Sequence, residues 1–263
     1  MPSPGRIIRS ALERRLSLRT RLGLVAADAR KRLAPRDLYR VRYGLGSVYL
    51  SRADYTVDRK SFDFAVVEGT YATDYDGAVV LDIGAHKGYY AAYAVTHGAC
   101  AVVTYEPEST NLAVLERTAD GYRNGIEWSI RHAAVDARSG RSDLHVMGAS
   151  WGHALAPPAA FAEHEVGIEP VEVVALADAL GETSSLCVGS RLVVKVNIEG
   201  AECTSILETS SRPWEGVSEV FVETHPWATC DASDLAAHLE PAGLIRSESA
   251  HPAVLRMRRE LRA

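Results

Sequence analysis

Short apolar runs alternate with segments of helical character from residue 79 onward. The apolar runs have the length and the β-branched content of strands and lie at 79–83, 100–105, 127–135, 191–198 and 218–223. The segments that read as helices lie at 89–95, 109–121, 201–209 and 234–239. Strands that alternate with helices require a mostly parallel sheet covered on both faces. We therefore predict an α/β fold with a doubly wound, mostly parallel, Rossmann-like sheet and a last antiparallel strand at 254–257.

A different pattern separates the third of these strands from the fourth. Residues 137–140 predict a turn, and the runs 142–146 and 171–176 predict strands, the first of them antiparallel. Between these runs, residues 148–170 form a long stretch without a regular pattern that contains Trp151 and His153. Such stretches inside compact domains are commonly lids or binding segments, so we expect this one to lie near a ligand.

The N-terminal part of the chain is basic. Residues 1–40 carry 11 Lys and Arg against three Asp and Glu, which leaves a net charge of −13 on the remainder of a chain whose formal net charge is −5. Apolar residues spaced among arginines from Ile7 to Arg40 predict helix, and residues 41–73 predict short strands at 48–50 and 55–57 and a helix. We predict a basic N-terminal arm and cap at 1–73 and a ligand-binding domain at 74–263.

Two interpretations of the basic arm remain open. Arginine-rich helices contact membrane surfaces or nucleic acids, but few aromatic residues accompany these arginines. We favour a helix packed on the acidic remainder, with its arginines solvated or paired, and expect nucleic acid not to be a partner.

Composition limits the location of the protein. No apolar run approaches the 18 residues of a membrane span, and the N-terminal segment lacks the apolar centre of a signal peptide. The cysteines show no Cys-x-x-Cys spacing, so we expect them to be reduced and zinc to be absent; they are Cys100, Cys187, Cys203 and Cys230. These features favour a cytoplasmic protein. The oligomeric state is open, with a homodimer as one alternative.

The most informative segment is the run from Val79 to Tyr90. Its apolar strand meets Asp82 and is followed by Gly84, His86 and Gly88 and then by the first predicted helix. Strand, glycine turn and helix in this order form the first unit of a nucleotide-binding sheet, in which glycine lets the backbone approach a ligand. Because a carboxylate at the strand end suits a cation better than a pyrophosphate, the pattern favours S-adenosylmethionine over a dinucleotide as the cofactor.

Acidic residues also end the next two predicted strands. Glu106 follows the second strand and is followed by Pro107, which stops the strand. An acid at this place in a doubly wound sheet accepts hydrogen bonds from ribose hydroxyls. Asp136 ends the third predicted strand. We assign Glu106, Pro107 and Asp136 to the cofactor site.

A second group of polar residues ends the fourth and fifth predicted strands. Lys195, Asn197 and Glu199 share one face, because strand side chains alternate every two residues, and Glu223 and His225 share a face of the following strand. Carboxyl ends of parallel strands meet at one edge, so we expect these residues to line a functional site, with Asn197 near the cofactor. For Glu202 and Lys195, a structural role in a helix cap or a salt bridge is as well supported as a catalytic role.

These motifs together resemble one family. The order LDIGAHKGYY (81–90), YEP (105–107), KVNIEGAE (195–202) and VETH (222–225) is similar to that of the FkbM family of S-adenosylmethionine-dependent methyltransferases. The resemblance covers residues 79–225 and implies a seven-stranded methyltransferase sheet. It also implies O-methylation of a small molecule in natural product biosynthesis, such as a secondary metabolite, a sugar or a glycolipid.

Four positions depart from the family pattern. His86 stands where the family usually has Asn, Lys87 where it has an apolar residue, Asn197 where it has Asp, and Ala177 where a Leu-Asp pair commonly follows the preceding strand. The first two alter the loop that faces the cofactor, and the third removes a negative charge from the site. These departures bear on the substrate and on metal use more than on the cofactor.

Two catalytic schemes fit the second group. His225 is our choice of general base for a substrate hydroxyl, because the ordinary pKa of histidine lies near neutrality, and Glu199 and Glu223 would orient it or hold the substrate. Alternatively, Glu199, Glu223 and His225 would hold Mg²⁺ or Mn²⁺, which polarises the hydroxyl. His153 is a weaker catalytic candidate.

Two other functions remain as alternatives. One is a nucleic-acid methyltransferase that uses the basic arm, which the acidic remainder of the chain disfavours. The other is a cofactor-binding protein without catalysis, in which His86, Lys87 and Asn197 mark lost chemistry.

Overall fold

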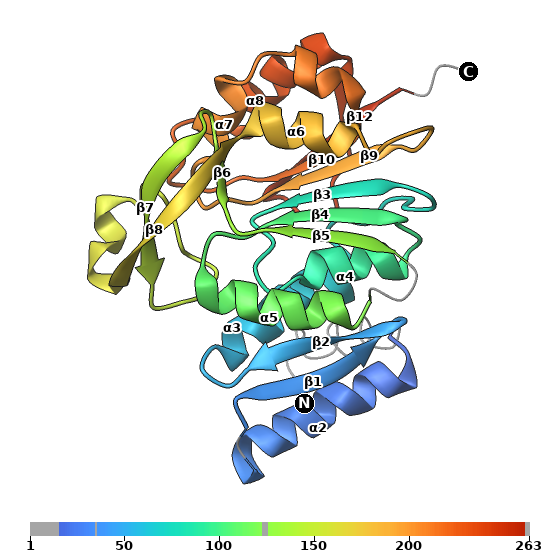
Figure 1. Ribbon diagram of the computed structural model, residues 1–263, viewed down its shortest axis with the longest axis vertical. Helices are drawn as coiled ribbons and strands as arrows, with labels where there is room; N and C mark the ends of the chain where they lie inside the picture. Colours follow the sequence, from blue (N-terminus) through green and yellow to red (C-terminus); the bar gives the residue numbers. More distant parts are fainter. Residues whose placement is uncertain (1–15, 35, 123–125, 261–263) are drawn as a thin grey trace.

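The computed structural model describes residues 16–34, 36–122 and 126–260 and is built on a seven-stranded sheet (Figure 1). The strand order is β11-β12-β10-β9-β3-β4-β5. Its strands are β3 (Val79–Ile83), β4 (Ala101–Tyr105), β5 (Glu127–Arg131), β9 (Leu192–Val196), β10 (Val217–Glu223), β11 (Leu244–Ser247) and β12 (Val254–Arg259). The five strands from β10 to β5 in this order run parallel, and β12 is antiparallel to both of its neighbours. The predicted Rossmann-like α/β fold and the seven-stranded sheet are confirmed, as is the antiparallel C-terminal strand.

Helices cover both faces of this sheet (Figure 1). Helices α4 (Tyr89–Thr96) and α5 (Ser109–Asp120) lie on one face, and α6 (Leu176–Ser184), α7 (Glu202–Leu207) and α8 (Ala232–Leu239) lie on the other. Strand β3 supplies both cores, because Val80 faces one and Leu81 and Ile83 face the other. None of the helices in the described part of the chain has both the length and the apolar character that crossing a bilayer requires.

The N-terminal part forms a layer of its own beyond α4 and α5 (Figure 1). It contains α2 (Leu18–Leu33), the antiparallel pair β1 (Leu38–Tyr43) and β2 (Gly46–Ser51), and α3 (Tyr55–Phe62), which continues as the π-helical turn η1 (Asp63–Val67). The predicted arm helix is confirmed over α2, and its expected start at Ile7 lies outside the described residues. The strand predicted at 48–50 is part of β2.

The strand predicted at 55–57 is wrong. These residues begin helix α3, whose buried side chains Tyr55, Asp58, Arg59 and Phe62 recur at helical spacing. The alternation over 55–57 covers only three residues, whereas the helical spacing of buried side chains extends over eight and therefore determines the structure.

A second, three-stranded sheet with the order β6-β8-β7 corrects two more predictions. The predicted strand 127–135 is two strands, because the chain leaves the central sheet after β5 and β6 (Ala134–Asp136) pairs with β8 (Glu165–Ala175) instead. The stretch 148–170 is not irregular throughout, since η2 (Ala159–His164) is a 3-10 helix and β8 pairs antiparallel with β7 (Gly140–Met147). The predicted antiparallel strand at 142–146 is confirmed within β7.

Two cysteines that we expected to be reduced form a disulfide. Cys203 of α7 is bonded to Cys230, which follows 27 positions later, whereas Cys100 and Cys187 are free. The packing of α7 beside α8 brings the pair together, which spacing along the sequence does not reveal. Closing a loop of this length typically contributes about 2–4 kcal/mol to stability. The bond also ties the segment after His225 to α7.

Candidate functional site

A cavity of about 860 Å³ lies at the carboxyl ends of β3, β4, β9 and β10. This volume lies within the range of about 300–1,000 Å³ that is usual for small-molecule sites. Residues of α3 and η1 line it, and so do residues of the loop 150–155. The predicted site residues that line it are Gly84, His86, Glu106, Pro107, Asn197, Glu199, Glu223 and His225.

The glycine turn after β3 brings two strand ends into close contact. Gly84 has a φ of +74°, and a Cβ at this position would lie 1.8 Å from the carbonyl oxygen of Asn197. Only glycine therefore allows β3 and β9 to end side by side at the cavity. Gly88 does not line the cavity. Its φ is +83°, and a Cβ at this position would lie 2.7 Å from Cδ1 of Leu115. Gly88 therefore lets α4 begin close to α5.

Asp82 lies beneath the cavity rather than in its wall. Its carboxylate is fully buried, and Oδ1 is 3.0 Å from Nζ of Lys195, which donates a 2.6 Å hydrogen bond to the carbonyl of Gly84. Burial raises the pKa of Asp82, and the ammonium of Lys195 opposes that rise. Asp82 thus acts on the glycine turn through Lys195, which itself lines the cavity.

Glu106 lies on the cavity wall at the end of β4. Its Oε2 accepts a 2.7 Å hydrogen bond from the backbone N–H of His86, and Oε1 accepts one of 3.1 Å from that of Glu108. The carboxyl group is nevertheless so deeply buried that its pKa is raised to about 8. A carboxylate so placed holds the glycine loop and keeps lone pairs for a ligand.

The two departures in the glycine loop have different roles. His86 has a φ of +51°, a conformation that asparagine tolerates better, and its Nε2 lies 3.0 Å from Oγ of Ser150. Burial lowers the pKa of His86 well below its usual value. Lys87 is fully buried and donates 2.5 Å and 3.2 Å hydrogen bonds to Asp58 and Ser51. Lys87 therefore binds the N-terminal layer to the loop and does not face the cavity.

Asp136 does not reach the cavity, which corrects its assignment to the cofactor site. Its Oδ1 accepts hydrogen bonds from the hydroxyls of Thr204 and Ser205, at 3.1 and 3.0 Å. The reason is that β6 belongs to the second sheet, so its end faces α7.

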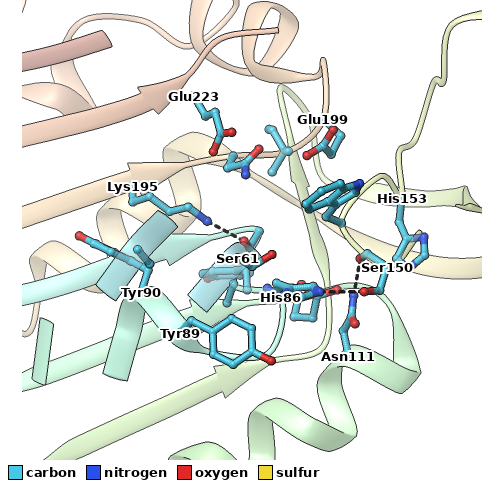
Figure 2. Close-up of a pocket in the computed structure, with 18 of the residues that line it drawn as sticks. Ser61, His86, Tyr89, Tyr90, Asn111, Ser150, His153, Lys195, Glu199 and Glu223 are labelled. Carbon is cyan, nitrogen blue, oxygen red and sulfur yellow. Dashed lines mark hydrogen bonds between the residues drawn. The ribbon is translucent and has the colours of Figure 1, made fainter. Parts of the chain in front are cut away.

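The second predicted group does gather at one end of the cavity. Figure 2 shows Glu199 and Glu223 at this end, and His86, Ser150 and Asn111 at the other. His225 lies between two carboxylates, with Nε2 3.5 Å from Glu199 and Nδ1 3.4 Å from Glu202. Burial by itself lowers the pKa of His225, but the two carboxylates outweigh it and raise the pKa to about 10. The ring is therefore an imidazolium at neutral pH.

Glu202 has the structural role that the sequence left open. Its two oxygens accept 2.8 Å hydrogen bonds from the backbone N–H groups of Ile198 and Gly200. These bonds fix the turn that carries Glu199, which adopts a φ of +55°. Glu199 is thus held in a left-handed conformation that few non-glycine residues adopt.

Sequence reasoning missed several residues of this end. The hydroxyl of Tyr71 donates a 2.9 Å hydrogen bond to Glu223, and the ring of Trp227 stacks on His225 with centroids 4.8 Å apart. Tyr89 and Tyr90 of α4 also line the cavity. Trp227 could have been found because it alternates with His225 and Glu223. No pattern in the sequence indicates Tyr71, because its hydrogen-bond partner Glu223 lies 152 positions away.

The predicted metal set does not fit a divalent ion. No three His, Cys, Asp or Glu side chains in residues 16–34, 36–122 and 126–260 are arranged to hold one. Of the expected ligands, Glu223 accepts the Tyr71 hydroxyl, and both ring nitrogens of His225 face carboxylates, those of Glu199 and Glu202.

The comparisons with known proteins find similarity to this chain only in the overall arrangement of the fold. No family model matches the sequence, and the search of curated proteins finds no match, so the FkbM resemblance is not confirmed. Among solved structures, the chain is similar to a fibrillarin pre-rRNA processing protein of Methanococcus jannaschii, with 10% identity, 86% of this chain and 85% of that chain covered, and a TM-score of 0.42.

Two further structures show the same level of likeness. One is an S-adenosylmethionine-dependent methyltransferase of Agrobacterium tumefaciens, with 8% identity, coverage of 86% and 71%, and a TM-score of 0.41. The other is the magnesium protoporphyrin IX methyltransferase of Synechocystis, with 9% identity, coverage of 92% and 95%, and a TM-score of 0.40. Similarity this distant assigns no function, so the proposed function rests on the site.

Proposed function

We propose that this protein is an S-adenosylmethionine-dependent methyltransferase that acts on a hydroxyl of a small molecule, as its resemblance to the FkbM family implies. The observation that carries the proposal is the cavity at the carboxyl ends of β3, β4 and β9, where the glycine turn lies beside the buried carboxylate of Glu106. In an open α/β sheet this is the place of the nucleotide, and the acid after the second strand of the unit is the ribose acceptor.

The residues around the turn suit this cofactor rather than a dinucleotide. Asp82 and Glu106 are the carboxyl groups beside the turn, and the ammonium groups of Lys195 and Lys87 are already paired with Asp82 and Asp58. Above the pKa of Glu106, which is about 8, a pyrophosphate would be repelled by its negative charge, whereas a cationic ligand would be attracted. When bound, S-adenosylmethionine supplies a methyl group on a sulfonium.

The opposite end of the cavity suits a hydroxyl-bearing substrate. Glu199 and Glu223 present carboxylate oxygens that accept hydrogen bonds from hydroxyls, and Trp227 offers an apolar face beside them. Holding a nucleophile in line with the reacting carbon can lower a barrier by about 7–11 kcal/mol. We assign this positioning to Glu199 and Glu223.

His225 is the residue to which we assign proton transfer. Because Glu199 and Glu202 hold it as an imidazolium, it accepts the proton of the substrate hydroxyl only after it has lost its own proton to solvent, which occurs as the pH approaches its pKa of about 10.

Cofactor affinity should depend on the ionisation of Glu106. If ribose hydroxyls donate to this carboxylate, Glu106→Gln should weaken S-adenosylmethionine binding by about 10-fold to 100-fold, because a hydrogen bond to a charged group contributes about 1.5–3 kcal/mol. The pKa of Glu106 is about 8, so binding below that pH must release a proton. Affinity of the wild-type protein should therefore rise with pH and level off above about 8, whereas the Gln variant should show a flat profile.

Titration calorimetry between pH 6 and 9 measures both effects. Glu172→Gln, which removes an exposed carboxylate of β8, is the matched control and should bind as the wild type does. A folded Glu106→Gln protein with unchanged affinity would remove Glu106 from the cofactor site.

A further inference from the structure

Helix α2 carries an apolar stripe that faces solvent. Leu18, Leu22, Val25 and Leu33 are 62%, 59%, 64% and 85% exposed. The first three follow the i, i+4, i+7 spacing of one helix face, and Leu33 continues it after the exposed Ala29. Four large aliphatic side chains on one face of a 16-residue helix form a continuous strip about 24 Å long.

The opposite face of the same helix is attached to the protein. Leu24 and Ala27 are buried, and α2 packs along β1. Asp28 accepts a 2.7 Å hydrogen bond from the hydroxyl of Tyr55, and Nζ of Lys31 lies 4.6 Å from the centre of the same ring. Helix α2 is therefore fixed by one apolar face and presents a second one outward.

Cationic residues border the exposed stripe on both sides. At 100° per residue, Arg19 and Arg30 fall along one edge, and Arg21 and Arg32 fall along the other. Asp28 is the only acidic residue of the helix. The stripe with its two arginine edges thus has the composition of a helix that lies in the headgroup region of a bilayer.

We propose that α2 is an interfacial helix that docks this protein on an anionic lipid surface. The aliphatic stripe enters the boundary between headgroups and acyl chains, while the arginines meet lipid phosphates and carboxylates. Charge complementarity favours this partner, since residues 1–40 carry a net charge of +8 on a chain that is otherwise acidic. A nucleic acid would use aromatic stacking surfaces, which the stripe does not offer. This proposal does not depend on the methyltransferase activity.

Vesicle co-sedimentation of the full chain tests the proposal. We expect the wild-type protein to bind vesicles of phosphatidylcholine with phosphatidylserine, and to bind those of phosphatidylcholine alone much more weakly. Binding should fall as sodium chloride increases, because exposed charges are screened. The triple variant Leu18→Gln, Leu22→Gln, Val25→Gln should lose at least about tenfold in partitioning, since apolar burial is removed without a change in charge.

The matched control is the triple variant Val166→Gln, Ile168→Gln, Val188→Gln. These three aliphatic residues are 70%, 55% and 91% exposed and lie outside α2, so this variant should sediment like the wild type. Circular dichroism melts confirm that both variants are folded.

Four outcomes would overturn the proposal. One is absence of wild-type binding to anionic vesicles, and another is equal loss in both triple variants. The third is a wild-type dimer in light scattering that the α2 variant converts to a monomer without a change in vesicle binding, which would assign the stripe to a second copy of this chain. Binding of a short RNA that the α2 substitutions abolish while vesicle binding persists would also contradict it.

Discussion

Gly84→Val should abolish S-adenosylmethionine binding and destabilise the protein. The new Cβ would lie 1.8 Å from the carbonyl oxygen of Asn197, so the ends of β3 and β9 must separate where we place the cofactor. A positive φ costs a non-glycine residue about 1–3 kcal/mol, and overpacking costs about 1–3 kcal/mol more. Calorimetry with the cofactor and a thermal melt measure the two effects.

Gly189→Val separates the two causes. Gly189 has a φ of +77°, close to the +74° of Gly84, but a Cβ there would have nothing within 4 Å. This variant should lose stability from backbone strain alone and keep its affinity for the cofactor. If both variants bind the cofactor as the wild type does, the glycine turn is not part of the site.

His225→Ala should lower kcat by about 100-fold or more with little change in cofactor affinity. A positioned general base typically contributes about 10²–10⁴ in rate. Because the pKa of His225 is raised to about 10, the wild-type rate should still be rising above pH 8 rather than levelling near neutrality, where free histidine titrates. The rise occurs because deprotonation creates the form that accepts a proton. The pH dependence of kcat, measured with a substrate that the enzyme accepts, tests this prediction.

His153→Ala is the control for this prediction. His153 also lines the cavity, but it lies near the other end, where Nε2 is 4.0 Å from Glu108. Its replacement should leave the pH profile unchanged. An active His225→Ala enzyme with an inactive His153→Ala enzyme would reverse the two assignments, and would move the chemistry to the loop 150–155.

The central sheet was predictable because its strands carry strong local signals. Buried parallel strands such as Val79–Ile83 and Leu192–Val196 are apolar except for one charged residue each, and both are fully buried in the structure. Gly84 follows the first of these strands, Glu199 comes shortly after the second, and Glu106 follows β4, and all three line the cavity. The spacing of apolar residues and the residues that end a strand are properties of a single segment, so they can be recognised in the sequence directly.

Features that depend on distant partners were not predictable in this way. The Cys203–Cys230 bond depends on how α7 and α8 pack, and the buried pair Lys87–Asp58 joins residues 29 positions apart. Asp136 looked like a strand-end ligand because nothing local shows that β6 leaves the main sheet. The protonated state of His225 likewise arises from Glu199 and Glu202, which the fold brings to its two nitrogens.

The most direct measurement of the central claim is a crystal structure of the full chain with S-adenosylhomocysteine. We expect one molecule in the cavity at the ends of β3, β4 and β9, with its ribose hydroxyls bonded to Glu106 and its amino acid part beside Gly84. Titration of the same ligand should give one site per chain. A ligand bound elsewhere on the protein, or no binding at millimolar concentration, would contradict the account.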